Sequence, residues 1–185
     1  MKNIYLVGFM ASGKTVTGKE LAKSQKWQFV DLDELIELKE RRSIADIFAK
    51  EGEPYFRRVE KLVLREVAAE ECFVVACGGG VVLDPDNLKL MKQTGKVVCL
   101  TVSAENILKR ACGKNHRPLL NVADPKKQIE LLLKLRAPYY AQADLAIDTD
   151  KLSVKEAAGK IIKIISMKSR VTGHRSQIKK KKRRK

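Results

Sequence analysis

The chain has 185 residues, of which 44% are hydrophobic and 32% are charged, and its formal net charge is +16. This length fits one domain or a domain with a tail, and the hydrophobic content is sufficient to bury a core. The apolar runs fall far short of the roughly 18 residues that a membrane-spanning helix needs, which excludes an integral membrane protein of the helical type.

The first predicted strand covers residues 4–7, and residues 8–15 follow it with the pattern G-x-x-x-x-G-K-T. Glycines in this phosphate-binding loop (P-loop) let successive N–H groups point at an anion, and the helix that begins near Gly13 adds its positive dipole end. Lys14 is then expected to reach the β- and γ-phosphates of a nucleotide, and the Thr15 hydroxyl to hold Mg²⁺. The alternative is a fortuitous glycine-rich turn, but the strand before the loop and the helix after it favour a nucleotide site.

The rest of the body alternates short apolar runs with helical patterns. Because the runs do not alternate with polar residues, they are typical of strands covered on both faces. Pro54 suits a first helical turn, and Ser153 with Glu156 forms a capping box. We predict strands at 4–7, 28–31, 73–77, 97–102 and 145–148, and helices at 14–26, 33–41, 43–50, 54–69, 86–92, 104–111, 126–141 and from 153 onward. This order predicts an α/β fold, a three-layer sandwich with a central parallel sheet of about five strands.

The carboxyl ends of parallel strands are where ligands gather in such a fold. Asp31 and Asp33 follow the second predicted strand. An aspartate there, beside a P-loop, can orient a water on Mg²⁺ or accept a substrate proton. The alternative is that Asp33 is the N-cap of the next helix, a role that can coexist with function.

Three consecutive glycines, residues 78–80, follow the third predicted strand. One interpretation is a tight turn. Three glycines in a row cost more chain entropy than a turn requires, so the sequence favours close approach of a ligand to this backbone.

Two segments contain candidate arginines. Arg57 and Arg58 lie near the start of a helix, where a solvated charged face is the alternative to a binding role. Arg117 lies in a loop bounded by glycine and proline, and we expect a lid around residues 112–123 that carries this arginine onto a transferring phosphate. His116 in the same loop is assigned no role.

The cysteines lie in or beside apolar segments and form no C-x-x-C pair; they are Cys72, Cys77, Cys99 and Cys112. We interpret them as reduced thiols of the core, and the protein as cytoplasmic, rather than as disulfide partners or zinc ligands.

The basic charge is concentrated at the C-terminal end. Residues 168–185 contain ten of the 38 basic residues and no acidic residue, whereas residues 1–167 carry a net charge of +6. A block of like charges without apolar periodicity is expected to be disordered, and it could make weak nonspecific contacts with nucleic acid. We therefore place one domain in residues 1–167 and a basic tail in residues 168–185.

Together these motifs resemble the shikimate kinase family over residues 3 to about 165, which is the whole body of the chain. The resemblance depends on segments in the right order, at residues 8–15, 29–33, 43–48, 51–53, 56–58, 78–80, 117–120 and 136–140. It implies a P-loop NTPase fold like that of nucleoside monophosphate kinases. It also implies phosphorylation of the 3-hydroxyl of shikimate by MgATP, giving shikimate 3-phosphate and ADP on the route to chorismate and the aromatic amino acids. The implied partners are ATP and shikimate, with Mg²⁺ as cofactor, no membrane, and a monomeric state.

The resemblance further implies roles for individual residues. The implied catalytic residues are Asp33, Lys14 and Arg117. The implied shikimate-binding residues are Asp33, Arg57, Gly79, Gly80 and Arg136. The implied ATP-binding residues are Ala11, Ser12, Gly13, Lys14, Thr15, Val16, Arg110 and Arg117. The implied magnesium site is Thr15 with Asp31. Ala11, Thr15 and Val16 depart from the residues that the family often has, although threonine keeps the hydroxyl.

Two other functions remain open from the sequence. One is another small-molecule kinase of the same architecture, for gluconate or a nucleoside monophosphate. Arg57, Arg136 and the three glycines favour a carboxylated polyol instead, because two guanidinium groups can clamp a carboxylate. The other is a P-loop binding module or a catalytically silent relative.

Overall fold

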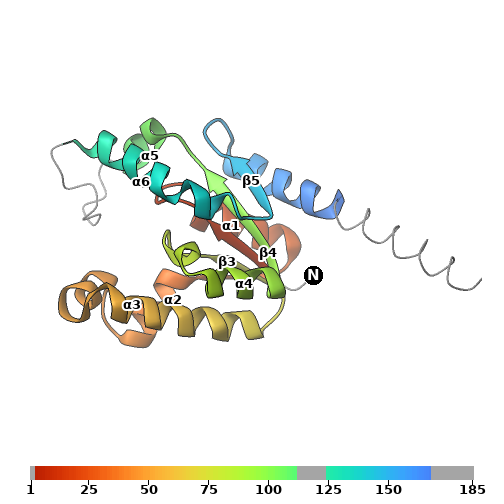
Figure 1. Cartoon of the computed structure of the whole chain (residues 1–185). Coiled ribbons are helices and arrows are strands. Elements are labelled where there is room, and N and C mark those ends of the chain that lie inside the picture. Colours follow the sequence, from red (N-terminus) through yellow and green to blue (C-terminus); the bar gives the residue numbers. More distant parts are fainter. Residues whose placement is uncertain (1–2, 112–123, 168–185) are drawn as a thin grey trace, which may run out of the picture.

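A five-stranded parallel sheet lies between two layers of helices in the computed structural model, which describes residues 3–111 and 124–167 (Figure 1). The strands are β1 (Asn3–Val7), β2 (Gln28–Asp31), β3 (Phe73–Ala76), β4 (Gly95–Thr101) and β5 (Leu145–Asp148). Their order in the sheet is β2-β3-β1-β4-β5, and every neighbouring pair is parallel. The predicted α/β class, the five strands and the parallel sheet are confirmed.

Alternate residues of the central strand pack into two different cores. Tyr5 and Val7 belong to a cluster completed by α2, α3, α4 and α6, whereas Ile4 and Leu6 belong to one completed by α1 and the last helix. This alternation buries both faces of the sheet, as continuous apolar strands require. A third cluster, which includes Phe9 of the P-loop, joins the loop to α5 and α6.

The helices begin and end within two residues of the predicted limits. They are α1 (Lys14–Gln25), α2 (Leu32–Glu40), α3 (Ile44–Ala69), α4 (Pro85–Thr94), α5 (Ala104–Ala111), α6 (Pro125–Tyr140) and a last helix described over 154–167, with a short 3₁₀ turn, η1 (Val81–Leu83). Figure 1 shows α2 beside α3 and α5 beside α6, in agreement with their contacts. Helices α1 and α2 end one residue early because Lys26 and Arg41 adopt the left-handed conformation, with φ of 54° and 53°.

Helix α3 contains the two helices predicted at 43–50 and 54–69. They run into one another through a kink at Gly52, whose φ of 77° is outside helical geometry. Ser43 caps the first part by accepting from the Asp46 amide, and Pro54 lies in the first turn of the second. The capping box of the last helix is also confirmed, because the Ser153 and Glu156 side chains bind one another's backbone amides.

One alternative interpretation and two local predictions are wrong. Asp33 is not an N-cap, because α2 begins at Leu32 and Asp31 caps it by accepting from the Asp33 amide. Cys72 is exposed rather than in the core, since it lies in the turn before β3 with a φ of 64°. Strand β4 begins at Gly95 rather than Val97, because its pairing with β1 extends to Asn3.

Among the helices that the structure describes, none has the length and apolar character needed to cross a bilayer. Cys77 and Cys99 are buried free thiols, as predicted. The predicted lid at 112–123, with Cys112, His116 and Arg117, and the basic tail at 168–185 lie outside the described residues.

Candidate active site

The P-loop connects β1 to α1 at the carboxyl edge of the sheet. Gly8 has a φ of 137°, and a Cβ there would collide with the Leu100 carbonyl, so this position requires glycine. Gly13, with a φ of 91°, is the N-cap of α1. Ala11 has a φ of 59°, so it occupies the left-handed region that favours glycine. The loop therefore has the tight curvature that a phosphate cradle needs.

Polar groups in the loop face inward. The Lys14 ammonium donates to the carbonyl oxygens of Gly8 and Phe9 at 3.0 and 3.1 Å, which folds this side chain back over the loop. The Ser12 hydroxyl is buried and has no hydrogen-bond partner within the described part of the chain. A buried hydroxyl left unpaired is destabilising, and a bound phosphate would supply its partner.

The predicted magnesium residues lie together. Thr15 Oγ1 donates to Asp31 Oδ2 at 2.8 Å, which joins the first turn of α1 to the end of β2. One hydroxyl and one carboxylate beside a phosphate cradle are what protein-bound Mg²⁺ takes together with nucleotide phosphates and waters. Within the described residues, no group of three or more His, Cys, Asp or Glu side chains could form a metal cage. The residues therefore fit an ion that arrives with a nucleotide.

The three glycines of residues 78–80 lie against three predicted substrate-binding side chains. A Cβ on Gly78 would lie 2.8 Å from Oδ1 of Asp33, and one on Gly79 would lie 3.4 Å from Nη1 of Arg136. A Cβ on Gly80 would collide with the guanidinium of Arg57. Protein side chains, one each from α2, α3 and α6, thus lie close to this backbone, and the close approach of a ligand stays a prediction.

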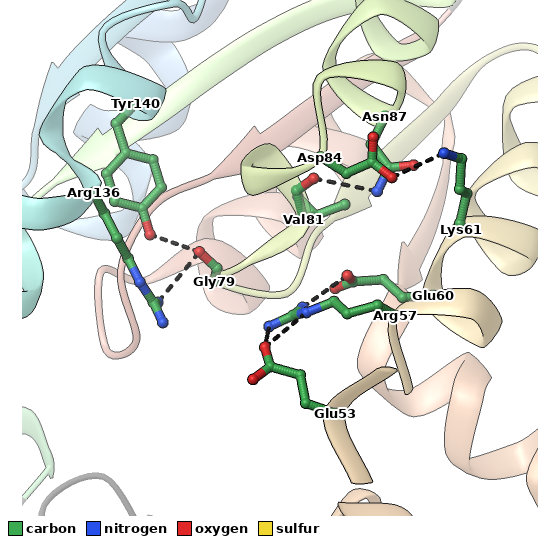
Figure 2. Close-up of polar contacts among 10 residues, drawn as sticks. All are labelled: Glu53, Arg57, Glu60, Lys61, Gly79, Val81, Asp84, Asn87, Arg136 and Tyr140. Atoms are coloured by element: carbon green, nitrogen blue, oxygen red, sulfur yellow. Dashed lines mark hydrogen bonds and ion pairs between the residues drawn. The ribbon is translucent and has the colours of Figure 1, made fainter. Parts of the chain in front are cut away.

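The alternative interpretation, that Arg57 lies on a solvated charged face, is wrong. Its side chain is 30% exposed, and its Nη1 donates to Oε2 of Glu60 at 2.8 Å (Figure 2). Its Nε and Nη2 donate to Oε1 of Glu53 at 3.1 and 2.9 Å. Glu53 is 59% exposed, so its contact with Arg57 can give way to a ligand. Glu60 is 1% exposed, so its contact holds the guanidinium in place.

Glu60 is a site residue that sequence reasoning missed. Burial raises the pKa of its carboxyl, and the neighbouring Arg57 lowers it in part. Its Oε1 is buried and has no hydrogen-bond partner among the described residues. The available signal was helical spacing, because Glu60 lies on the same face of α3 as the buried Phe56, Val63 and Val67.

Asp33 is half-buried at the start of α2, close to Lys14 of the P-loop and to the glycines of residues 78–80. Burial raises the pKa of its carboxyl most, and the negative charge of Asp31 raises it further. Lys14 and Arg57 act in the opposite direction. Asp33 thus lies close enough to Lys14 of the P-loop and to Arg57 of α3 for both positive charges to act on its carboxyl.

Two further predicted arginines contact the loops. Arg136 of α6 lies 5.6 Å from the ring centroid of Phe9 and donates to the Gly79 carbonyl at 3.4 Å (Figure 2). Arg110 of α5 donates to the carbonyls of Thr149 and Ala11 at 2.9 and 3.3 Å. Val16, also predicted at the nucleotide site, is 52% exposed in the first turn of α1.

The parallel sheet, the P-loop between β1 and α1 and a cationic acceptor site beside it define a P-loop kinase. The family model for shikimate kinase matches residues 10–166. The chain belongs to the shikimate kinase family, whose members are ATP-dependent kinases.

Individual relatives agree with this membership. A shikimate kinase of Thermoanaerobacter pseudethanolicus is 46% identical over 88% of this chain and 95% of its own length. A solved shikimate kinase of Acinetobacter baumannii in complex with shikimate superposes with a TM-score of 0.86 at 39% identity, covering 91% of this chain and 94% of that one. The shikimate kinase of Aquifex aeolicus gives a TM-score of 0.80 at 33% identity, covering 90% and 98%.

Proposed function

We propose that this protein transfers the γ-phosphoryl group of MgATP to the 3-hydroxyl of shikimate, giving shikimate 3-phosphate and ADP. The observation that carries the proposal is the meeting of Asp33, Arg57 and Arg136 at residues 78–80, directly beside the P-loop. The solved relative that holds shikimate supports the same acceptor. The route served is the synthesis of chorismate and the aromatic amino acids.

The acceptor carries one carboxylate and several ring hydroxyls. We assign the carboxylate to Arg57 and Arg136, since each charge-assisted hydrogen bond contributes about 1.5–3 kcal/mol. The exposed Glu53 is the partner that Arg57 exchanges for this carboxylate. Asp33 accepts hydrogen bonds from the ring hydroxyls, and the Gly79 and Gly80 amides donate to them.

Transfer through a loose transition state needs positioning and charge neutralisation more than covalent chemistry. Lys14 and Arg117 neutralise the transferring phosphoryl group, while Asp33 takes the hydroxyl proton. Residues 11–16 hold the phosphates of ATP, and Arg110 with Arg117 flanks the adenine. Thr15 and Asp31 would hold Mg²⁺, which when bound shields the phosphate charges.

Acceptor specificity separates this proposal from the other kinases of the same architecture. We expect a coupled ADP-release assay to give turnover with shikimate, and background rates with gluconate and with nucleoside monophosphates. A preference for either of the latter would overturn the assignment. ATP binding without turnover on any acceptor would indicate a binding module.

Arg57→Lys tests the carboxylate clamp. Lysine keeps the positive charge beside Glu60 but loses the planar two-point fork. We expect the KM for shikimate to rise about tenfold or more, from the loss of one charge-assisted hydrogen bond, while the KM for ATP stays near its original value. Steady-state kinetics with each substrate varied in turn measures this.

The matched control is Arg58→Lys, because Arg58 is the next residue and is exposed. We expect its kinetic constants to stay close to those of the parent. If Arg57→Lys impaired ATP and shikimate alike, or neither, Arg57 would be a structural residue of α3.

We also propose that residues 1–167 are the kinase domain, with a lid around residues 112–123. We propose further that the protein acts as a monomer in the cytoplasm.

Deleting residues 168–185 is expected to leave kcat unchanged and the melting temperature within about 2 °C, because a solvated polycation buries little surface. Loss of several degrees would place the domain boundary further along the chain.

The same deletion tests the proposed contact of the tail with nucleic acid. Ten cations that neutralise phosphates give weak binding without sequence preference that falls steeply with salt. We expect gel-shift or anisotropy titrations to show such binding by the full chain and its loss in the truncated one. Equal binding by both forms would assign the contact to the body instead.

A further inference from the structure

Tyr140, the last residue of α6, holds the backbone of the acceptor site. Its hydroxyl donates to the carbonyl oxygen of Gly79 at 2.7 Å (Figure 2). Tyr140 is only 9% exposed and packs in the core cluster that α2, α3 and α4 also build. Because the ring is fixed by this packing, the hydroxyl is a donor of fixed position.

Arg136 is the second donor to this carbonyl, and its bond is the longer of the two. The distance from its Nη1 to the Gly79 oxygen is 3.4 Å, at the outer limit of a hydrogen bond. Arg136 and Tyr140 are four residues apart, which places both on one face of α6. Pro138 lies between them and fixes the backbone φ of the last turn.

We propose that Tyr140 is a positioning residue for the acceptor substrate: by occupying the Gly79 carbonyl, it fixes residues 79–80 and leaves Arg136 available to the substrate carboxylate. This inference rests on the proposed function, which assigns Arg136 and the Gly79 and Gly80 amides to shikimate. Tyr140 itself contacts the backbone of Gly79.

The chemistry of the pair supports this division of roles. Burial raises the pKa of Tyr140 to about 12, so the phenol stays protonated and can donate throughout the working pH range. A half-buried carbonyl that loses its better donor draws more strongly on the remaining one. Without the Tyr140 hydroxyl, the Arg136 guanidinium would therefore be held by Gly79, in competition with a bound carboxylate.

Tyr140→Phe removes the hydroxyl and keeps the ring that packs in the core. We expect the KM for shikimate to rise about threefold to tenfold, the range for one neutral hydrogen bond, with kcat and the KM for ATP within about twofold of the parent. The control is Tyr139→Phe, because Tyr139 is the neighbouring phenol and is 39% exposed. We expect that variant to match the parent.

The coupling to Arg136 is tested by a double-mutant cycle. In an Arg136→Met background, we expect Tyr140→Phe to lower kcat/KM for shikimate by a smaller factor than in the parent, because no guanidinium remains to be misdirected and only the positioning of residues 79–80 is lost. Equal effects of Tyr140→Phe in both backgrounds would overturn this coupling.

Other outcomes separate this inference from the proposed function. Equal rises in KM for ATP and shikimate, or equal behaviour of Tyr140→Phe and Tyr139→Phe, would overturn the role of Tyr140 alone. An unmutated chain that fails to phosphorylate shikimate would overturn the proposed function, and this inference with it.

Discussion

Replacing Lys14 with methionine is expected to lower kcat by about 10³-fold or more, an effect of the size that other cations on a transferring phosphoryl group have. Methionine keeps most of the length of the side chain and removes the charge. In the structure the Lys14 ammonium lies on the Gly8 and Phe9 carbonyls, within the P-loop itself. The proposed function requires this ammonium to leave these carbonyls for the phosphates of ATP, so that its charge acts where negative charge is transferred.

The matched control is Lys23→Met, an exposed lysine in the last turn of the same helix. We expect that variant to keep its turnover. Both variants should remain folded, because Lys14 is half-buried at the loop and is not part of the core clusters. The measurement is ADP release together with a thermal melt. Unchanged turnover in Lys14→Met would defeat the assignment of residues 8–15 to ATP.

The strands were predictable because strands that are buried on both faces consist of continuous apolar residues, which the sequence shows directly. Residues 4–7, 73–76 and 97–100 are continuous apolar runs, and a sheet covered on both faces selects such runs. Their ends are less predictable: β4 includes Gly95 and Lys96, which add nothing apolar but pair with β1. Helix ends were predicted to within two residues because caps such as Ser43 and Ser153 are local features.

The acceptor site shows where local reasoning stops. The sequence pointed to Asp33, Arg57 and the glycines separately, but together the glycines face side chains from three different helices. Such pairings depend on how α2, α3 and α6 pack on the sheet, which no local pattern encodes. Glu60 was missed for a different reason: its helical spacing from apolar residues of α3 was a local signal, but a glutamate in a charged stretch is usually solvated, so the charge outweighed the spacing.

Asp33→Asn is expected to lower kcat by about 10²- to 10⁴-fold, the usual span for the loss of a general base. Asparagine keeps the size of the side chain and some of its hydrogen bonding, but it cannot take up the hydroxyl proton. We expect the KM for shikimate to change less than kcat. The control is Glu34→Gln, the neighbouring carboxylate, which is exposed in the same helical turn.

Stability distinguishes a base from a structural carboxylate at this position. Burial and the charge of Asp31 both disfavour the ionised form of Asp33, which is what raises its pKa. Removing this charge should therefore leave the melting temperature unchanged or raise it, while activity falls, as is common for residues retained for function. A melting temperature lowered by several degrees together with the loss of turnover would indicate a structural role. If Asp33→Asn kept full turnover, Asp33 would only orient the acceptor hydroxyl, and transfer would proceed without a base at this position.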